Sequence, residues 1–278
     1  MKSRVKAYAK VNLFLDITGR LENGYHTLNT VMQQVDIYDT VTVETTGSGY
    51  ITIECTNPAV PCNEKNIAYK AAKAFLSEIG SNDGVSISIE KNIPLEAGMG
   101  GSSTDGAAVM VALNEIYGKP FTTERLCEIG ARLGADVPFC ILGGTAVCTG
   151  IGEVMTPVSC KKDYVLGIVK PGFSCSTPVA YRAYDENPLP INVNFDSFTA
   201  ALSEGCEGWG DNMYNVFEKL YDNPEISAIT RIMQENGAVG AILTGSGSAV
   251  FGVFRNRTTA ENALNKLEIP FKIITNPI

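Results

Sequence analysis

Strict alternation of hydrophobic and polar positions marks two segments in the first third of the chain. Residues 40–55 alternate on both sides of Gly47-Ser48-Gly49, which predicts a β-hairpin. Residues 85–90, VSISIE, alternate as well and predict a further strand. Apolar positions at helical spacing predict helices at 64–80, 107–118 and 122–134, and the N-terminal residues predict a first strand. This part of the chain therefore mixes strands and helices.

The second half continues the mixture after a break rich in proline and charge at 155–163. Its apolar runs predict strands at 164–170, 240–246 and 248–254, and helices at 211–221, 224–236 and 258–267. The elements do not follow a regular β-α-β alternation, so the predicted fold class is α+β. We expect two domains, residues 1–157 and residues 158–278.

The composition is that of a folded protein that does not act on nucleic acid. Of the 278 residues, 45% are hydrophobic and 19% are charged, which is typical of a compact domain. The net charge of −8 argues against a broad nucleic-acid surface. No apolar run approaches the roughly 20 residues that span a bilayer. We expect a cytoplasmic protein with a small-molecule ligand, and the sequence leaves open whether it is a monomer or a homodimer.

Cysteine and histidine usage argues against a zinc centre. The chain has eight cysteines without any C-x-x-C pair, and His26 is its one histidine. Cysteines scattered through apolar runs are most often buried free thiols, and we expect that here. Free thiols fit a reducing compartment.

A run of small residues, AGMGGSSTDGAA at 97–108, lies between a predicted strand and a predicted helix. The first N–H groups of a helix have no partner within the helix, and glycine lets a ligand approach the backbone closely. The hydroxyls of Ser102, Ser103 and Thr104 add donors, so the run predicts a phosphate site. It matches neither the Walker A loop nor G-x-G-x-x-G. A turn that packs the helix closely on a sheet is the alternative.

Three further stretches contain residues whose positions call for an explanation. The first, LTGSGSAVFG at 243–252, is a second glycine-rich run and predicts at least a tight hairpin. In GADVPFC, Asp136 follows a helix-ending glycine and is either a turn residue or a site residue. Lys10 lies in an apolar strand, where it must reach solvent, pair with an acid or line a site.

Together these stretches resemble the GHMP kinase superfamily, whose signature loop is similar to PLEAGMGGSSTDGAA from Pro94. The resemblance implies an N-terminal domain like ribosomal protein S5 domain 2 and a ferredoxin-like C-terminal domain. It implies an ATP-dependent kinase that uses Mg²⁺. The segments with Gly24-Tyr25-His26 and STPVAY at 176–181 resemble the branch of the family whose acceptor alcohol carries a cytidine diphosphate.

The resemblance also implies roles for individual residues. Asp136 and Lys10 match catalytic positions, and Asn12 would contact the acceptor. The nucleotide site would be formed by Asn66, Lys91, Pro94, Ala97, Gly98, Met99, Gly100, Gly101, Ser102, Ser103 and Thr104. The cytidine pocket would be formed by Tyr25, His26 and Tyr181, with Thr177 on the diphosphate side and Gly245, Ser246 and Gly247 shaping the cleft floor. No acidic metal-ligand set is evident, so Mg²⁺ would meet Ser102 or Ser103.

Several alternatives remain open from the sequence. Another GHMP kinase, such as a homoserine or mevalonate-pathway kinase, would share the loop but would not need the Gly-Tyr-His segment. A ligand sensor without catalysis would need neither Lys10 nor Asp136. A nucleic-acid-binding module would share the N-terminal fold, and the net charge argues against it.

Overall fold

The computed structural model of the protein describes residues 1–221 and 223–278. Its contacts divide the chain into two units. The first comprises residues 1–9, 37–93 and 100–143, and the second comprises residues 10–36, 94–99 and 144–278. The long strands β1 (Lys2–Arg20) and β2 (His26–Thr45) contribute residues to both units. This is a division by contact density, and the domain boundary expected at 157 stays a prediction.

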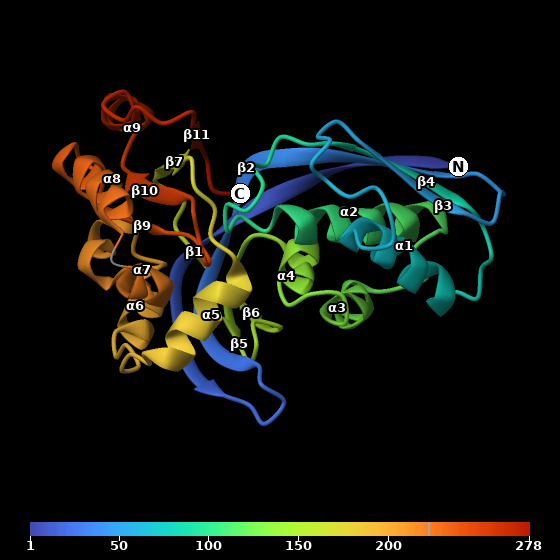
Figure 1. Ribbon diagram of the computed structural model, residues 1–278, viewed down its shortest axis with the longest axis horizontal. Helices are drawn as coiled ribbons and strands as arrows, with labels where there is room; N and C mark the ends of the chain where they lie inside the picture. Colours follow the sequence, from blue (N-terminus) through green and yellow to red (C-terminus); the bar gives the residue numbers. More distant parts are fainter. Residues whose placement is uncertain (222) are drawn as a thin grey trace. The chain divides into compact units, whose positions relative to one another are not determined.

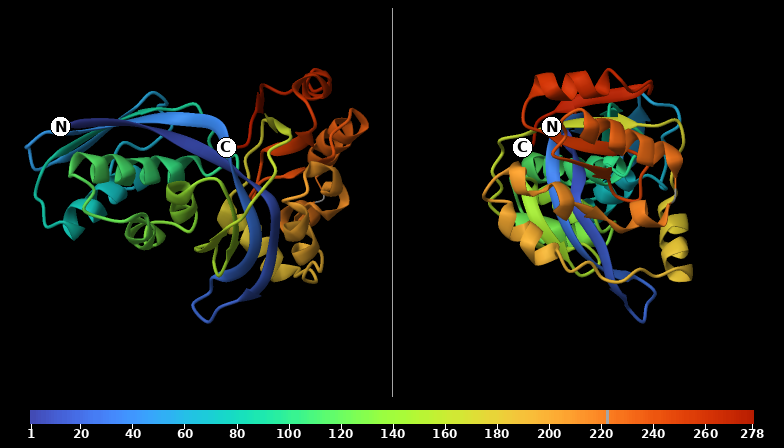
Figure 2. Two further views of the ribbon diagram at one scale, coloured as in Figure 1. Left: turned by 180° about the vertical axis from the view of Figure 1, so that it is seen from behind. Right: turned by 90° about the vertical axis from the view of Figure 1, so that its left-hand side faces the viewer.

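The first unit is a sheet with helices against one of its faces. Strand order is β3-β4-β2-β1, with β3 at Ile51–Cys55 and β4 at Val85–Glu90. Its helices are α1 (Ile67–Glu78), α2 (Gly101–Ile116), α3 (Thr123–Ala131) and α4 (Val137–Leu142). Figure 1 shows α1 and α2 along the sheet, and the view from behind in Figure 2 shows the same layering.

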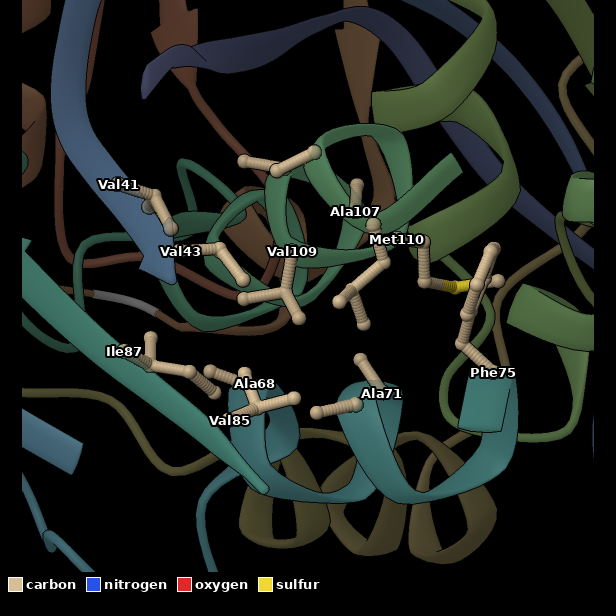
Figure 3. Packing of buried hydrophobic residues seen from close by; sticks show 14 of the residues in the cluster. Val41, Val43, Ala68, Ala71, Phe75, Val85, Ile87, Ala107, Val109 and Met110 are labelled. Atoms are coloured by element: carbon tan, nitrogen blue, oxygen red, sulfur yellow. The ribbon is translucent and has the colours of Figure 1, made fainter. Parts of the chain in front are cut away.

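The core of the first unit forms between this sheet and the helices. Figure 3 shows valine and isoleucine side chains of β2 and β4 that face small residues of α1 and α2: Val41, Val43, Val85 and Ile87 against Ala68, Ala71, Ala107 and Val109, with Phe75 and Met110 beside them. The alanines allow the two helices to lie close together. Burying a valine or isoleucine side chain stabilises the fold by about 1.5–3 kcal/mol.

The predicted hairpin at 40–55 is wrong, because β4 lies between its two strands. Strand β2 pairs antiparallel with β4, with Thr40 opposite Glu90. Strand β3 pairs with the other edge of β4 in parallel, with Ile51 opposite Val85. Alternation indicates which face of a strand is buried, but it does not identify the neighbouring strand.

Helix α2 begins at Gly101, six residues before the expected start at 107. Gly100 precedes it in the left-handed backbone conformation, with φ of 74°. The small residues were expected to form a loop, but most of them belong to the first turns of the helix. The other helices predicted in this unit are confirmed at 67–78 and 123–131, and Thr122 caps the second.

The second unit contains an antiparallel sheet of order β11-β7-β10-β9, comprising Phe271–Thr275, Val165–Lys170, Val250–Phe254 and Gly240–Leu243. Helices α8 (Pro224–Glu235) and α9 (Arg257–Leu264) pack on it. The hairpin of β9 and β10 is confirmed, with Leu243 opposite Val250. Figure 1 shows this sheet in yellow and red.

The remaining elements of this unit were mostly missed. Strands β5 (Thr145–Thr149) and β6 (Val154–Pro157) extend from β2, and β8 (Tyr214–Asn215) pairs with β1. The helical segments are α5 (Thr177–Glu186), α6 (Phe195–Ala201), α7 (Val216–Leu220) and the short 3₁₀ turns η1 (Cys206–Gly208) and η2 (Gly210–Asn212). The helix predicted at 211–221 is therefore mostly wrong. Asn215 interrupts it, because its side chain accepts the N–H groups that begin α7.

The cysteines are free thiols, as expected, but their expected burial is mostly wrong. Cys148 and Cys206 are buried, Cys62 is exposed, and Cys55, Cys127, Cys140, Cys160 and Cys175 are half-buried. Among residues 1–221 and 223–278, no helix is long and apolar enough to cross a lipid bilayer.

Candidate active site

The start of α2 has the features of an anion site within the first unit. Gly100 has no side chain to cap the helix, so no side chain accepts a hydrogen bond from the first N–H groups of α2 at this position. Ser102 and Ser103 are the second and third residues of α2, and their side chains are exposed and half-buried, respectively. The helix dipole adds partial positive charge there. The geometry can therefore receive a phosphate without a lysine in the loop.

Thr104 differs from the two serines before it. Its side chain is buried, and its Oγ1 donates a 2.7 Å hydrogen bond to the backbone oxygen of Tyr8. This bond anchors the first turn of α2 to strand β1. Because the hydroxyl proton is used inside the first unit, the Thr104 oxygen can only accept, and its contact with a nucleotide stays a prediction.

Lys91 lies beneath the start of α2, in a buried cluster of charges. Its side chain is 2% exposed, and Nζ donates to Asp39 at 2.5 Å and to Asp105 at 2.7 Å. A third bond, of 3.2 Å, goes to the backbone oxygen of Gly101, the first residue of α2. An ammonium group has three donors, so these bonds use all of them. The ammonium of Lys91 thus fixes the position of the first residue of α2.

The two carboxylates of this cluster have different surroundings. Asp39 Oδ1 also accepts the backbone N–H groups of Asn92 and Ile93. Asp105 Oδ1 is buried and has no hydrogen-bond partner among the described residues. Burial is the largest influence on the Asp105 carboxyl, and it raises the pKa. The positive charge of Lys91 lowers this pKa, whereas the neighbouring Asp39 raises it further. The resulting pKa of Asp105 is about 7. Burial alone would lower the pKa of Lys91, but Asp105 and Asp39 raise it above its ordinary value.

Asn66 and Asp136 occupy helix starts in the same unit. The Asn66 amide oxygen accepts the N–H of Ala68 at 2.9 Å, and its amide nitrogen donates to Pro61 at 2.8 Å. Asn66 therefore caps α1, and any contact with a nucleotide would be additional to that role. Asp136 is half-buried at the residue before α4, as expected for a junction, and its side chain does not cap that helix.

Residues 94–99, the first part of the glycine-rich stretch, belong to the second unit and pack against the β9–β10 turn. Ala97 accepts the backbone N–H of Ala249 at 3.2 Å. Gly98 has φ of 72°, and a Cβ there would overlap the backbone oxygen of Thr244. Ala97 and Met99 are buried. The packing explanation therefore accounts for Gly98, while the helix start at Gly100 retains the features of an anion site.

Residues 94–99 pack against the β9–β10 turn, which the sequence analysis expected to shape the floor of a cleft. Gly245 and Gly247 have φ of 55° and 93°, which favours glycine. The amide nitrogen of Asn215 donates to the backbone oxygens of Leu243 and Gly245, at 2.8 and 2.9 Å. Ser246 and Thr177 are joined through their hydroxyl groups at 2.9 Å. The structure thus brings two predicted residues together at the start of α5.

Lys10 and Asn12 project from the same side of β1 in the second unit. Lys10 is 4% exposed and donates to Asn12 Oδ1 at 2.8 Å. The amide nitrogen of Asn12 donates to Thr30 at 2.9 Å, and its backbone N–H donates to Thr244 at 3.0 Å. The amide is thereby held in one orientation, and it presents its oxygen to the ammonium group. The sequence analysis did not predict this contact between Lys10 and Asn12, and the roles expected for the two residues stay predictions.

The expected cytidine pocket is centred on His26. The His26 ring is buried and stacks on Tyr181, with centroids 4.9 Å apart and planes at 31°. Tyr25 lies 59% exposed before β2. A sandwich of a base between Tyr25 and Tyr181 stays a prediction.

Two residues of this cluster were missed by the sequence analysis. Asp185 pairs with His26 at 2.7 Å, and the ring of Tyr184 meets the His26 ring edge-on. Both lie one turn beyond Tyr181 on α5. Their helical spacing from a predicted site residue was the available signal.

Over the part that the structure describes, no group of three or more histidine, cysteine, aspartate or glutamate side chains is placed to hold a metal ion.

Comparison with protein families agrees with this geometry. Residues 66–144 match the model of the GHMP kinases N terminal domain, and residues 207–273 match the GHMP kinases C terminal model. The chain therefore belongs to the GHMP kinase family, whose members are small-molecule kinases, and the expected α+β fold is confirmed.

Individual relatives narrow the family further. The 4-diphosphocytidyl-2-C-methyl-D-erythritol kinase of Clostridium perfringens is 41% identical over 97% of this chain and 94% of its own length. The enzyme of that name from Caldicellulosiruptor bescii is 40% identical, over 98% of this chain and 96% of its own length. Within the GHMP kinases, the chain thus groups with the kinases of this name.

Solved structures show the same fold. A crystal structure of 4-(cytidine 5'-diphospho)-2C-methyl-D-erythritol kinase is 31% identical and covers 99% of both chains with a TM-score of 0.82. A homoserine kinase from Cytophaga hutchinsonii has a TM-score of 0.80 at 18% identity, covering 100% of this chain and 94% of its own. At that identity the likeness concerns the fold alone.

Proposed function

We propose that the protein transfers the γ-phosphoryl group of ATP to the 2-hydroxyl of 4-diphosphocytidyl-2-C-methyl-D-erythritol, in the non-mevalonate pathway to isoprenoid precursors. The observation that carries the proposal is the 41% identity, over nearly the whole chain, to relatives named for this activity. Two features of the structure support it. The start of α2 is suited to phosphate, and a buried histidine between two tyrosine rings is suited to a base.

The proposed nucleotide site is the start of α2. Backbone N–H groups from Gly101 onward, with the hydroxyls of Ser102 and Ser103, hold the triphosphate. Lys91 supports this site indirectly, because its hydrogen bond to the backbone oxygen fixes the position of Gly101. The Ser102 or Ser103 hydroxyl would offer an oxygen ligand to Mg²⁺ bound together with ATP, and the ion would supply positive charge beside the phosphates.

The proposed chemistry rests on Asp136 and Lys10. Phosphoryl transfer needs little covalent help from the protein and depends on positioning and charge. Asp136 orients the acceptor hydroxyl and accepts its proton, and Lys10 stabilises the negative charge that develops on the attacking oxygen. Asn12 holds the ammonium of Lys10 in one position through its amide oxygen, and this orientation is the part that the described contacts support.

The proposed acceptor site selects the base end of the substrate. His26 reads the base edge, and Tyr181 and Tyr25 supply the stacking surface. Thr177 lies on the diphosphate side, joined to Ser246. Binding energy from the base then places the distant 2-hydroxyl for reaction, so an acceptor without cytidine should react poorly.

The proposal is tested by coupled ADP release with purified protein and a panel of acceptors. We expect turnover with the cytidylylated acceptor, very slow turnover with 2-C-methyl-D-erythritol 4-phosphate, and none with homoserine or mevalonate. A Tyr25→Ala variant should lose roughly 5- to 150-fold in kcat/KM for the acceptor, because one stacked base is worth about 1–3 kcal/mol. Equal efficiency on the truncated acceptor would contradict the cytidine pocket.

A further inference from the structure

His26 is held by a carboxylate that the proposed mechanism does not use. Its Nε2 lies 2.7 Å from Oδ1 of Asp185, and the two side chains are 7% and 31% exposed. The other carboxylate oxygen, Oδ2, lies 3.4 Å from the guanidinium of Arg20. Asp185 is thus fixed from one side by a cation of β1 and meets the histidine with its other oxygen.

The rings around His26 fix the plane of the imidazole. Tyr181 stacks against it at 4.9 Å, and Tyr184 approaches at 5.9 Å with its plane at 90°. Rotation of the imidazole about its bond to Cβ would break the hydrogen bond to Asp185 and disturb both ring contacts. The histidine is therefore presented in one orientation.

The hydrogen bond determines which ring nitrogen carries the proton. An ionised carboxylate only accepts hydrogen bonds, so Nε2 must be the donor. In a neutral imidazole the other nitrogen, Nδ1, then has a lone pair and accepts. Without Asp185, nothing in this contact would favour one tautomer over the other.

Cytosine and uracil differ in the group that an acceptor would meet. Cytosine carries an exocyclic amino group that donates, and the corresponding position of uracil is a carbonyl oxygen that accepts, like that of thymine. A lone pair on Nδ1 would pair with the amine and would oppose the carbonyl oxygen. We infer that Asp185 is a positioning residue that sets the tautomer of His26 and thereby makes the pocket select an aminopyrimidine base. This inference rests on the proposed function for its substrate.

The tautomer can be measured without any substrate. Because His26 is the one histidine of the chain, protein labelled with ¹⁵N-histidine gives a single pair of ring-nitrogen signals. In the free protein at mildly alkaline pH, we expect a protonated signal from Nε2 and an unprotonated signal from Nδ1. Asp185→Ala should give averaged signals from both tautomers, and Asp185→Asn, whose amide oxygen can still accept, should restore part of the difference.

A neighbouring residue provides the matched control. Glu186 follows Asp185 on α5 and is exposed, so Glu186→Gln should leave the ring signals of His26 unchanged. A wild-type protein with its proton on Nδ1 would overturn the inference. So would an Asp185→Ala variant with the wild-type signals. Either result would leave the proposed kinase activity unaffected.

Kinetics with two acceptors tests the consequence for selectivity. The acceptors are the cytidylylated substrate and its uridine counterpart, each varied at saturating ATP. We expect Asp185→Ala to lose about 5- to 20-fold in kcat/KM for the cytidine acceptor, to lose much less for the uridine acceptor, and to keep the KM for ATP. An equal loss on both acceptors would show a merely structural role. No turnover of the cytidine acceptor by wild-type protein would reject the proposed function, and the NMR result would then still decide the tautomer.

Discussion

Lys91 in the first unit and Lys10 in the second are both buried lysines, and the hydrogen bonds described for them go to different kinds of group. Lys91 donates to two carboxylates and a backbone carbonyl. The described hydrogen bond of Lys10 goes to the amide oxygen of Asn12, which is neutral. A carboxylate partner cancels much of the field of an ammonium group, whereas an amide oxygen mainly orients the group.

The sequence analysis placed Lys10 at a catalytic position and Lys91 in the nucleotide site, and the contacts suggest different effects for their loss. We expect Lys91 to contribute chiefly to the stability of the helix start, and we propose that Lys10 contributes chiefly to the reaction. Loss of Lys91 should therefore affect folding first, and loss of Lys10 should affect the rate first. The following variants are designed to separate these two effects.

The largest effect is expected from Lys91→Met. The change leaves Asp39 and Asp105 buried beside each other without a cation, and breaking a buried charge pair in this way costs about 3–5 kcal/mol. Urea denaturation measures the loss in the free energy of unfolding. Lys73→Met, at an exposed position of α1, is the control and should stay within about 0.5 kcal/mol of wild type. A Lys91→Met protein as stable as this control would remove the structural role.

Asp136→Asn should be the next most severe, and its effect should fall on the rate. A positioned acid–base group contributes on the order of 10²-fold or more, and asparagine cannot accept the proton. We expect kcat to fall by that amount while ATP binding, measured by titration calorimetry, is nearly unchanged. Activity within threefold of wild type would exclude Asp136 from the chemistry.

Lys10→Met sharpens the comparison directly. Methionine fills a similar volume without charge, and the lost hydrogen bond to the Asn12 oxygen should by itself cost about 1–3 kcal/mol of the free energy of unfolding. We expect kcat to fall by roughly 10²-fold, because the charge that stabilises the attacking oxygen is lost. Measuring kcat and unfolding on the same preparation separates the two. If the variant keeps the full rate, Lys10 is a core lysine.

The smallest effect is a dependence on pH. The Asp105 carboxyl has its pKa raised from 3.8 to about 7, chiefly by burial. The stability that this group contributes is therefore fully present below its unfolded pKa and is lost as the pH rises through about 7. Relative to Asp105→Asn, the wild type should lose free energy of unfolding between about pH 4 and about pH 8. Parallel profiles for the two proteins would contradict this behaviour of Asp105.

Local patterns in the sequence were sufficient for some of these features and not for others. The glycine-rich run, Lys10 and His26 could be singled out because each stands within a short, recognisable motif. The partners that decide what these residues do lie far along the chain. Asp39 is 52 residues from Lys91, and Asp185 is 159 residues from His26. No short-range pattern reports such a pairing, because it is created by the fold.

The same limit explains the wrong hairpin. The alternating pattern at 40–55 correctly indicated strands at 40–45 and 51–55, but β4 arrives from residues 85–90 and separates them. Helix α2 began early for a different reason. Glycine and serine are poor helix formers, so their presence predicts a loop, whereas the packing of α2 in the core extends the helix through them.

The contact between Gly98 and Thr244 limits how the glycine-rich segment at residues 94–104 could be re-engineered. Because a side chain at Gly98 would overlap the backbone of the β9–β10 turn, and a Cβ at Gly245 would come within 2.9 Å of the Gly98 oxygen, the two segments fit only as a matched pair. A designer who transplanted residues 94–104 into another scaffold would transfer only one of the two segments that pack against each other. The graft would need residues 243–249 as well. A library that randomised either segment alone would consist mostly of variants whose two segments cannot pack together.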